Sequence, residues 1–408
     1  MRRAGFFLAT VLRNHALVAA LFCACACAWA EAPPKSEARR NLEDFDTFWR
    51  AIDSGYAYFD GSHAAWKGAR DAWRPKAAKA TSRAEFVATL EGAIAYLHDD
   101  HVSLSERTAG SPRRIPAETD IWAEWIDGAA HVTAVRPFSD ADVAGLRPGH
   151  VVTHVNGRPV ERVVEDRLRT LQAKGRAAND WALRHVLAGP REGSLKLAVR
   201  GADDARTLTI EHRPAAPANG PPILARRMGE DRNLGYLRIR NALGDAALPA
   251  AFDAALNYLK DTKGLMLDLR ETPGEGKREI TEAIVAHFAG NNANYRAGVI
   301  VLVDRWTAGE GEALAAALVE RARATLVGTP MAGLRGRLRE APLPNSGIVV
   351  RFPAEKGLLA NGTPREALRP SVEIDLAAPS GGPGDPILYQ ALKLFEPSPA
   401  RADRSVPR

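Results

Sequence analysis

The second half of the chain alternates two kinds of segment, and this alternation constrains the fold more than any other feature. Short, almost continuously apolar segments predict strands buried on both faces, and they lie near residues 234–239, 264–270, 299–303 and 324–328. Segments with helical spacing of apolar residues lie near residues 247–259, 279–288 and 312–321. Strands that alternate with helices predict an α/β fold with a largely parallel sheet. Ligands of such sheets usually bind beyond the carboxyl ends of the strands.

One of these strands runs into a turn of small residues and then into a helix. The segment reads Val301-Leu302-Val303-Asp304-Arg305-Trp306-Thr307-Ala308-Gly309-Glu310-Gly311-Glu312, which is the layout of a turn that presents a nucleophile. Gly309 stands at the tip, where a serine would be expected, and the next serine along the chain is Ser346. The turn therefore has the predicted shape for nucleophilic attack and no hydroxyl to carry it out.

The first residues predict a cleavable export signal over residues 1–30. Arginines precede an apolar run from residue 16 to residue 28, and Ala28-Trp29-Ala30 supplies the small residues that a signal peptidase reads. We therefore expect an exported mature chain, periplasmic or secreted. All 3 cysteines fall within this signal, so no disulfide or thiolate ligand is expected after cleavage.

Length and charge bound the remaining possibilities. A chain of 408 residues with 46% hydrophobic residues is long enough to bury several cores, which favours a multidomain protein. The formal net charge is +6 and the basic residues are scattered rather than clustered, so we expect no nucleic-acid partner. We also expect no cofactor and no metal. The oligomeric state does not follow from the sequence.

Changes of pattern divide the mature chain into domains. Residues 31–117 have apolar residues at helical spacing, and Ser82 three residues before Glu85 predicts a capping box at a helix start. The next region has short strands and turns, including Asn156-Gly157, a pair that favours a tight hairpin turn. The predicted domains are a helical domain at 31–117, a β-rich domain at 118–213, a linker at 214–222, an α/β core at 223–378 and a C-terminal tail at 379–408.

The β-rich region resembles a PDZ domain of the bacterial protease type. The resemblance rests on Ala144-Gly145-Leu146-Arg147-Pro148-Gly149 and Val155-Asn156-Gly157, with His150 in place of the usual acid. It implies that a peptide binds by strand addition, with its terminal carboxylate on backbone N–H groups of the loop at Ala144, Gly145 and Leu146. A β-rich spacer without a ligand is the alternative.

The whole mature chain resembles the carboxy-terminal processing peptidases, also called tail-specific proteases. The stretches that carry the resemblance are "GYLRI", "LMLDLRETPGEG", "VIVLVDRWTAGEGEALA" and "RATLVGTPMAG". Members are serine peptidases, so the resemblance implies an α/β core of the ClpP/crotonase type, with a helical domain and an inserted PDZ-like domain. The family's nucleophilic serine falls on Gly309.

The resemblance also assigns a base. One subgroup of the family uses a lysine, which falls on Leu334 here. The other subgroup, similar to the tricorn core protease, uses the histidine of a Leu-x-Asp-x-His motif. That motif matches Leu97-His98-Asp99-Asp100-His101 and makes His101 the candidate base. Glu355 or Glu366 is the candidate for the further glutamate of this subgroup.

The same resemblance places the oxyanion donors at the backbone of Gly274 and at the N–H of Glu310. The helix that begins near Gly311 would point its positive end into the site. Two carboxylates disturb this pattern, because Glu275 replaces a loop glycine and Glu310 lies beside the predicted hole. A carboxylate near a developing negative charge would repel it.

Three hypotheses follow. The first is an exported protein of the tail-specific serine peptidase family that has lost proteolysis and binds peptides or protein C-termini. The second is an active hydrolase that uses Thr307 as a displaced nucleophile or a water held by His101. The third is a protein that binds a small apolar ligand. A metal site at His98 and His101 and a phosphate loop at residues 274–277 are weaker alternatives.

Overall fold

The computed structural model describes residues 36–59, 63–171, 173–202, 204–212, 220–229, 231–240, 243–291, 293–379 and 384–396. The predicted export signal, residues 1–30, and residues 214–219 of the predicted linker lie outside the described residues. Within the described ranges, no helix has the length and apolar character needed to cross a membrane.

A helical unit forms near the start of the described chain. Its elements are α2 (Glu37–Gly55), α3 (Ala64–Lys79), α4 (Arg83–Ile94), the short 3₁₀ helix η1 (Ala95–Leu97) and β1 (Ser103–Leu104). The hydroxyl of Ser82 accepts from the N–H of Glu85, so the predicted helix start is confirmed. Phe45, Phe48 and Leu90 are fully buried in its core, as their helical spacing predicts.

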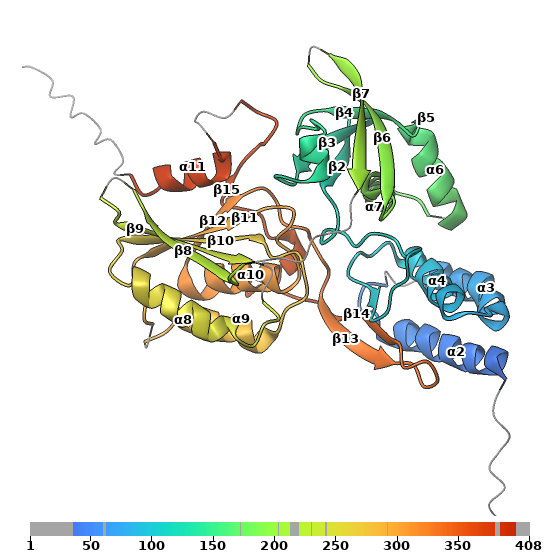
Figure 1. Cartoon of the computed structure of the whole chain (residues 1–408). Helices are drawn as coiled ribbons and strands as arrows, with labels where there is room; N and C mark the ends of the chain where they lie inside the picture. The colour runs from blue at the N-terminus through green and yellow to red at the C-terminus, as the bar shows by residue number, and fades with distance from the viewer. Residues whose placement is uncertain are drawn as a thin grey trace, which may run out of the picture.

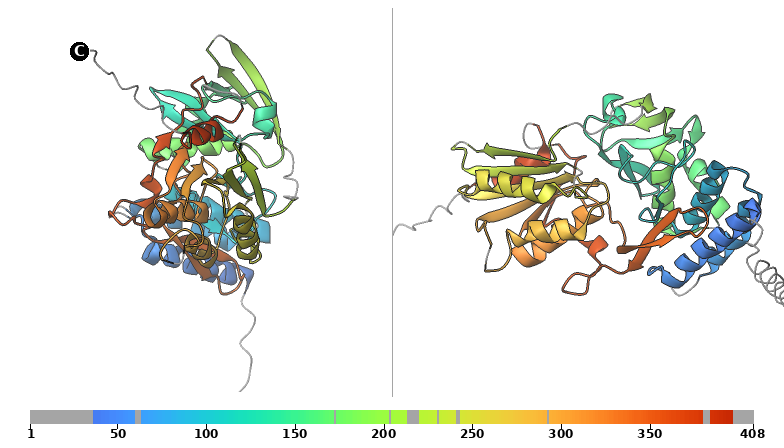
Figure 2. Two further views of the ribbon diagram at one scale, coloured as in Figure 1. Left: turned by 90° about the vertical axis from the view of Figure 1, so that its left-hand side faces the viewer. Right: turned by 60° about the horizontal axis from the view of Figure 1, so that its bottom comes forward.

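A hairpin from much later in the chain completes this helical unit. Strands β13 (Arg337–Pro342) and β14 (Val349–Glu355) pair with β1 in the order β1-β14-β13. Val350 and Phe352 of β14 are 0% exposed and pack in the same cluster as Phe45. Figure 2 shows the hairpin leaving the α/β core and lying against the helices. Residues 337–355, which fall within the predicted core of 223–378, thus bury apolar side chains in the helical unit instead of against the sheet of the core.

The middle of the chain forms a six-stranded antiparallel sheet with helices against it, in which β5 pairs only with β4. The elements are β2 (Ile121–Ile126), β3 (Ala129–Val135), α5 (Asp140–Val143), β4 (Val151–Val155), β5 (Arg158–Pro159), α6 (Val160–Leu171), α7 (Arg176–Ala188), β6 (Gly193–Arg200) and β7 (Ala205–His212). The main strand order is β2-β3-β4-β6-β7. Asn156 and Gly157 take φ values of 50° and 79°, as the predicted turn requires. Helix α7 is an addition that the β-rich pattern did not predict.

The α/β core is built on one mostly parallel sheet. Its elements are β8 (Ile223–Met228), β9 (Leu234–Arg240), α8 (Leu248–Leu259), β10 (Gly264–Glu271), α9 (Arg278–Ala286), β11 (Gly298–Val303), α10 (Glu310–Ala322), β12 (Thr325–Gly328), η2 (Arg365–Ala367), β15 (Val372–Glu373) and α11 (Pro386–Lys393). The strand order is β15-β12-β11-β10-β9-β8, and only β8 is antiparallel to its neighbour. Figure 1 shows α8, α9 and α10 on one face of this sheet and α11 on the other. The predicted parallel sheet is confirmed.

Helix α11 corrects the prediction that residues 379–408 are only a tail. Asp385 caps the helix by accepting from the N–H groups of Ile387 and Leu388, and Pro386 follows it at the first helical position. Ile387 is 3% exposed and packs in a cluster with Leu302 of the central strand. The helix is needed because a parallel sheet must be covered on both faces.

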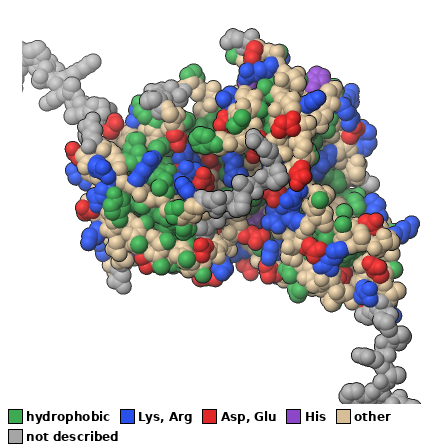
Figure 3. All heavy atoms as spheres, in the orientation of Figure 1, with side chains coloured by type: hydrophobic (Ala, Val, Ile, Leu, Met, Phe, Trp, Pro, Cys, Tyr) green, Lys and Arg blue, Asp and Glu red, His purple; other side chains and the backbone are tan. Residues whose placement is uncertain are grey.

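The surface carries charges of both signs. Figure 3 shows Lys, Arg, Asp and Glu side chains interspersed over the face that it presents. A mixed surface of this kind produces no extended field of one sign on that face.

Candidate active site

The turn after β11 has a backbone that few residues other than glycine adopt. Gly309 has φ 54° and ψ −113°, and helix α10 begins at the next residue. The N–H of Ala308 donates to the carbonyl of Thr272 at 3.1 Å, and the carbonyl of Thr307 accepts from Ala332 N–H at 3.1 Å. These bonds tie the turn to the loops after β10 and β12. The tip of the turn is therefore held at the carboxyl end of the sheet, where the sequence predicted a site.

Thr307 does not face the site. Its side chain is 0% exposed, and its hydroxyl donates to the carbonyl of Leu269 at 3.1 Å. The same oxygen accepts from the N–H of Asp304 at 3.1 Å. Both the proton and a lone pair of the hydroxyl are thus engaged in the core. This geometry contradicts Thr307 as a displaced nucleophile.

Glu312 connects the turn to the loop after β12. Its side chain is 1% exposed, and its carboxylate accepts from the N–H groups of Gly309 at 3.1 Å, Gly333 at 2.7 Å and Leu334 at 3.1 Å. Burial raises the pKa of Glu312 to about 7, although these N–H groups favour the charged form. In the sequence, Glu312 stands out only as the last residue of the turn segment. Its spacing of three residues from Gly309 is the capping signal that identifies its role.

His101 lies opposite the tip of the turn. A Cβ atom placed on Gly309 would be 3.9 Å from Nε2 of His101 and 3.4 Å from the carbonyl oxygen of Gly274. Nδ1 of His101 donates to the carbonyl of Arg335 at 2.5 Å, which leaves the lone pair on Nε2. Burial lowers the pKa of His101, so the ring is neutral at pH 7. The structure thus brings the candidate base close to the nucleophile position, with the unprotonated Nε2 available to accept a proton from a group at that position.

The backbone around His101 is fixed by a buried aspartate. Asp99 accepts from the N–H of His101 at 2.9 Å and from the hydroxyl of Tyr56 at 2.7 Å. Burial raises the pKa of Asp99, and the two donors oppose that shift. Within the described residues, neither Glu355 nor Glu366 has a hydrogen bond or ion pair with His101. The carbonyl of Arg335 orients the ring instead, and a backbone atom of this kind has no signature in the sequence.

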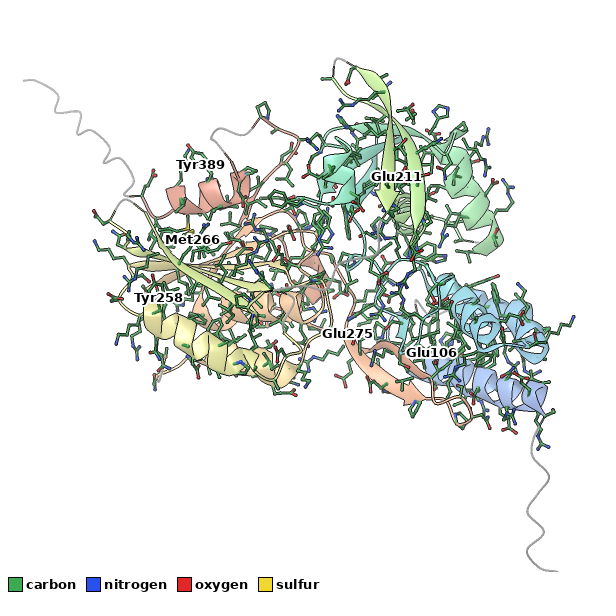
Figure 4. The ribbon with its side chains drawn as sticks, in the orientation of Figure 1. Glu106, Glu211, Tyr258, Met266, Glu275 and Tyr389 are labelled. Atoms are coloured by element: carbon green, nitrogen blue, oxygen red, sulfur yellow. The ribbon has the colours of Figure 1, made fainter. Side chains whose placement is uncertain are left out.

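The predicted oxyanion donors remain available. Within the described ranges, the N–H groups of Gly274 and Glu310 donate to no protein acceptor. The carboxylate of Glu310 accepts from the hydroxyl of Thr281 at 2.9 Å. Glu275 pairs with Arg351 at 3.1 Å, and Figure 4 shows it at the junction between the core and the hairpin β13–β14. Each carboxylate thus has a partner of its own, while the charge of Glu275 still acts on His101.

A cleft of about 970 Å³ contains both His101 and Gly309. Its walls come from the helical unit, from helices α6 and α7, from the core and from the hairpin β13–β14. The lining carries several arginines and glutamates, including Arg114, Glu275 and Arg351. The candidate site is therefore a cleft between domains with charged side chains on a partly apolar lining, large enough for a ligand of several residues.

The loop predicted to hold a peptide carboxylate has no free donors. The N–H of Ala144 donates to the carbonyl of Asp140, that of Gly145 to Asp142 and that of Leu146 to Ala141, all at 3.0 Å. Gly145 has φ 91° and ends helix α5, while Leu146 is 0% exposed. These three residues form a helix end and anchor the core of the domain. They are therefore not arranged as the carboxylate-binding loop that the sequence predicted.

Among the described residues, the histidines of the alternative metal site are not part of a group that could hold an ion. Within the described part of the chain, the acidic and histidine side chains that meet closely enough to hold an ion are Asp120, Asp140 and His212. Nη1 of Arg113 lies 2.6 Å from Nδ1 of His212, so a guanidinium already supplies positive charge there. Neither His98 nor His101 belongs to this group.

Comparison with known proteins agrees with this architecture. The model of peptidase family S41 matches residues 277–375, the tricorn protease C1 domain matches residues 38–95, and a PDZ domain model matches residues 131–178. No curated protein sequence matches the chain.

Solved structures are also similar to the chain. Mature CPAF complexed with lactacystin is 14% identical, with 83% of this chain and 95% of that chain covered and a TM-score of 0.51. The photosystem II D1 C-terminal processing protease is 19% identical, with 82% and 93% covered and a TM-score of 0.49. The tricorn protease is 15% identical, with 88% and 37% covered and a TM-score of 0.46.

The chain belongs to peptidase family S41 and combines its α/β core with a PDZ domain and a tricorn C1 segment.

Proposed function

We propose that this member of peptidase family S41 is an exported protein that binds peptides or protein C-termini and does not cleave them at the Gly309 turn. One observation carries the proposal: the Cβ position of Gly309 lies 3.9 Å from Nε2 of His101, and no hydroxyl occupies it. Formation of an acyl-enzyme requires a side-chain oxygen at that point. The base therefore has no proton to take from the turn.

The rest of the cleft still suits a peptide. The N–H groups of Gly274 and Glu310 are free to donate to a carbonyl or carboxylate oxygen. The matched PDZ domain supports a ligand with a peptide C-terminus. The lining combines charged side chains, such as Arg114 and Glu275, with apolar ones, such as Leu334, which suits a peptide that has both polar and apolar groups. The apolar leader at residues 1–30 supports export to a periplasm or to the medium.

Restoring the missing hydroxyl tests the loss of cleavage. Fluorescent peptides with free, apolar C-termini are incubated with wild-type protein, Gly309→Ser and Gly309→Ser/His101→Ala. We expect wild type to bind without turnover and Gly309→Ser to gain hydrolysis. The second substitution removes a general base and should lower that gain by about 10²- to 10⁴-fold.

Gly347→Ser is the matched control, because Gly347 also has a positive φ, 69°, and open space around its Cβ position. It should gain no hydrolysis. Turnover by wild-type protein that disappears in His101→Ala would overturn the proposal in favour of a water activated by His101. Wild-type protein that binds none of the peptides would overturn peptide binding itself.

A further inference from the structure

One end of the cleft is formed by two helices of the PDZ domain. Arg167 of α6 and Trp181 and His185 of α7 line it, together with Asp100 from the helical unit. The guanidinium carbon of Arg167 lies 4.9 Å from the centre of a Trp181 ring. Trp181 is only 3% exposed, so the ring is a fixed surface for the guanidinium plane. Figure 1 shows both helices at the boundary with the helical unit.

The side chain of Arg167 has no hydrogen-bond acceptor among the residues that the structure describes. Within the described residues, its buried Nε has no hydrogen-bond partner, and no carboxylate lies within ion-pair distance of its guanidinium. Asp100 is the acid whose charge acts on it. The oxygens of Asp100 are already engaged, since Oδ1 accepts from Nε2 of His185 at 2.8 Å and Oδ2 from Arg184 at 3.4 Å. The cation of Arg167 is therefore left without a hydrogen-bonded counter-ion.

Neighbouring groups share this lack of partners. Nε2 of His98 and Nε of Arg184 are also buried without a hydrogen-bond partner in the described part of the chain. The ring of His98 lies 5.0 Å from that of Trp181. Buried polar groups without partners are rare, and a cluster of them calls for a missing ligand or water. Of these three residues Arg167 lines the cleft, so an anion there would supply the acceptor oxygens and the negative charge that its guanidinium lacks.

We propose that Arg167, held against Trp181, is an anion-binding subsite that receives the carboxylate of a ligand lying in the cleft. The planar fork of an arginine matches two carboxylate oxygens, and stacking on an aromatic ring fixes its orientation. This proposal rests on the proposed function for its occupant, which is the free C-terminal carboxylate of a peptide. The carboxylate would then be recognised by the side chain of Arg167 on α6 and not by the Ala144–Leu146 turn, whose N–H groups are engaged.

Binding of matched peptides tests the subsite. Calorimetry measures the affinity of one peptide in two forms, with a free C-terminus and with a C-terminal amide, for wild-type protein and Arg167→Met. We expect Arg167→Met to bind the free form at least about 10-fold more weakly and the amide with nearly unchanged affinity. Arg169→Met is the control, because Arg169 lies on the same helix, is 75% exposed and pairs with Asp166. Its affinity should stay within about twofold of wild type.

Sodium acetate separates this inference from the proposed function. If acetate raises the Tm of wild-type protein but not of Arg167→Met, the subsite is supported even when no peptide binds. Equal affinity of wild type and Arg167→Met for the free peptide would overturn the subsite and leave peptide binding in the cleft intact. Equal affinity of wild type for the free and amidated peptides would overturn it as well.

Stability of the unliganded variants distinguishes a binding role from a structural one. Removal of a buried cation without a counter-ion should leave the Tm of Arg167→Met equal to or above that of wild type. A clear fall in Tm would contradict the proposal. Arg167→Lys keeps the charge without the fork, so it should bind the free peptide with an affinity between those of wild type and Arg167→Met. If Arg167→Lys bound the free peptide with wild-type affinity, recognition of the carboxylate by the planar guanidinium group would be contradicted.

Discussion

Two turns in this molecule have sequences that predict backbone N–H groups aimed at a ligand, and only one has them free. At the Gly309 turn, the N–H groups of Gly274 and Glu310 find no acceptor in the described chain. At the Ala144–Leu146 turn, all three N–H groups are engaged by carbonyls of helix α5. The difference follows from direction, because one turn precedes a helix and the other follows one. A helix start leaves N–H groups unpaired, whereas a helix end uses the N–H groups beyond it to satisfy its last carbonyls.

The largest expected effect comes from the carboxylate that holds the Gly309 turn. In Glu312→Ala, the N–H groups of Gly309, Gly333 and Leu334 lose their acceptor. Unsatisfied buried donors are costly, so the free energy of unfolding should fall by about 3 kcal/mol. Urea denaturation followed by circular dichroism measures the change.

Glu310→Ala is the control for this substitution. Its carboxylate accepts from the side chain of Thr281 and from no backbone group of the turn. The loss should stay below about 1 kcal/mol, as for an ordinary hydrogen bond. Equal losses in the two variants would show that Glu312 does not hold the turn together.

The second largest effect concerns backbone strain, which should differ between the Gly309 turn and the Ala144–Leu146 turn. Alanine at Gly309 or Gly145 meets no close atom, since the shortest distance for a Cβ is 3.4 Å at Gly309 and the space at Gly145 is open. Gly309→Ala must nevertheless adopt φ 54° with ψ −113°, outside the region that alanine tolerates. We expect a loss of about 1 to 3 kcal/mol at Gly309 and about 1 kcal/mol at Gly145. A larger loss at Gly145 in the same denaturation experiment would reverse the comparison.

Acidification should reveal a smaller difference between two histidines: His98, whose ring packs against Trp181, and His150, beside the PDZ turn. Burial lowers the pKa of His98 to about 4, from an ordinary value of 6.5. Between these values the unfolded chain takes up the proton and the folded chain does not, so stability falls as the pH drops below about 6.5. Burial also lowers the pKa of His150, which accepts from the N–H of Arg147 beside the PDZ turn.

Melting temperatures from pH 7 to pH 4 measure this effect. The Tm of wild-type protein should fall as the pH drops. We expect this fall to be reduced more by His98→Gln than by His150→Gln, because burial lowers the pKa of His98 by a large amount. An identical acid dependence in wild type and His98→Gln would show that His98 does not titrate in this way.

The smallest expected effect concerns peptide affinity at the PDZ turn. Because the N–H groups of Ala144, Gly145 and Leu146 are engaged, Gly145→Ala should change the affinity for a free-carboxylate peptide by less than about twofold. Calorimetry at a temperature where the variant is fully folded measures this. A loss of tenfold or more, with unchanged stability, would restore the turn as the carboxylate site.

The sequence predicted those elements whose burial leaves a periodic pattern. The strands at 264–270 and 299–303 and the helix at 312–321 follow from apolar spacing and correspond to β10, β11 and α10. Strand β13 leaves no such pattern, because most of its residues are exposed and its extended form depends on pairing with β14. Helix α7 lies in a region whose other segments indicate strands, and the helix α11 is only 8 residues long.

The residues of the candidate site also divide into those that a local sequence pattern reveals and those that it does not. Motifs suggested His101 and the Gly309 position, because both are side-chain positions with a recognisable spacing. The partner of His101 is the carbonyl of Arg335, and the acceptor for the turn is a glutamate that looks like an ordinary helix residue. The shortage of partners around Arg167 depends on which acids lie nearby in space, which no local pattern records.

Because the hairpin β13–β14 packs against the helical unit, the parts of the protein must fold in a particular order during synthesis. During synthesis, helices α2 to α4 leave the ribosome long before the strands that complete their core. The carbonyl that holds His101 follows it by 234 residues. A nascent chain must therefore close this long loop before the cleft exists, and non-local closure of this kind slows folding. The cleft is thus among the last features of the protein to form as it is made.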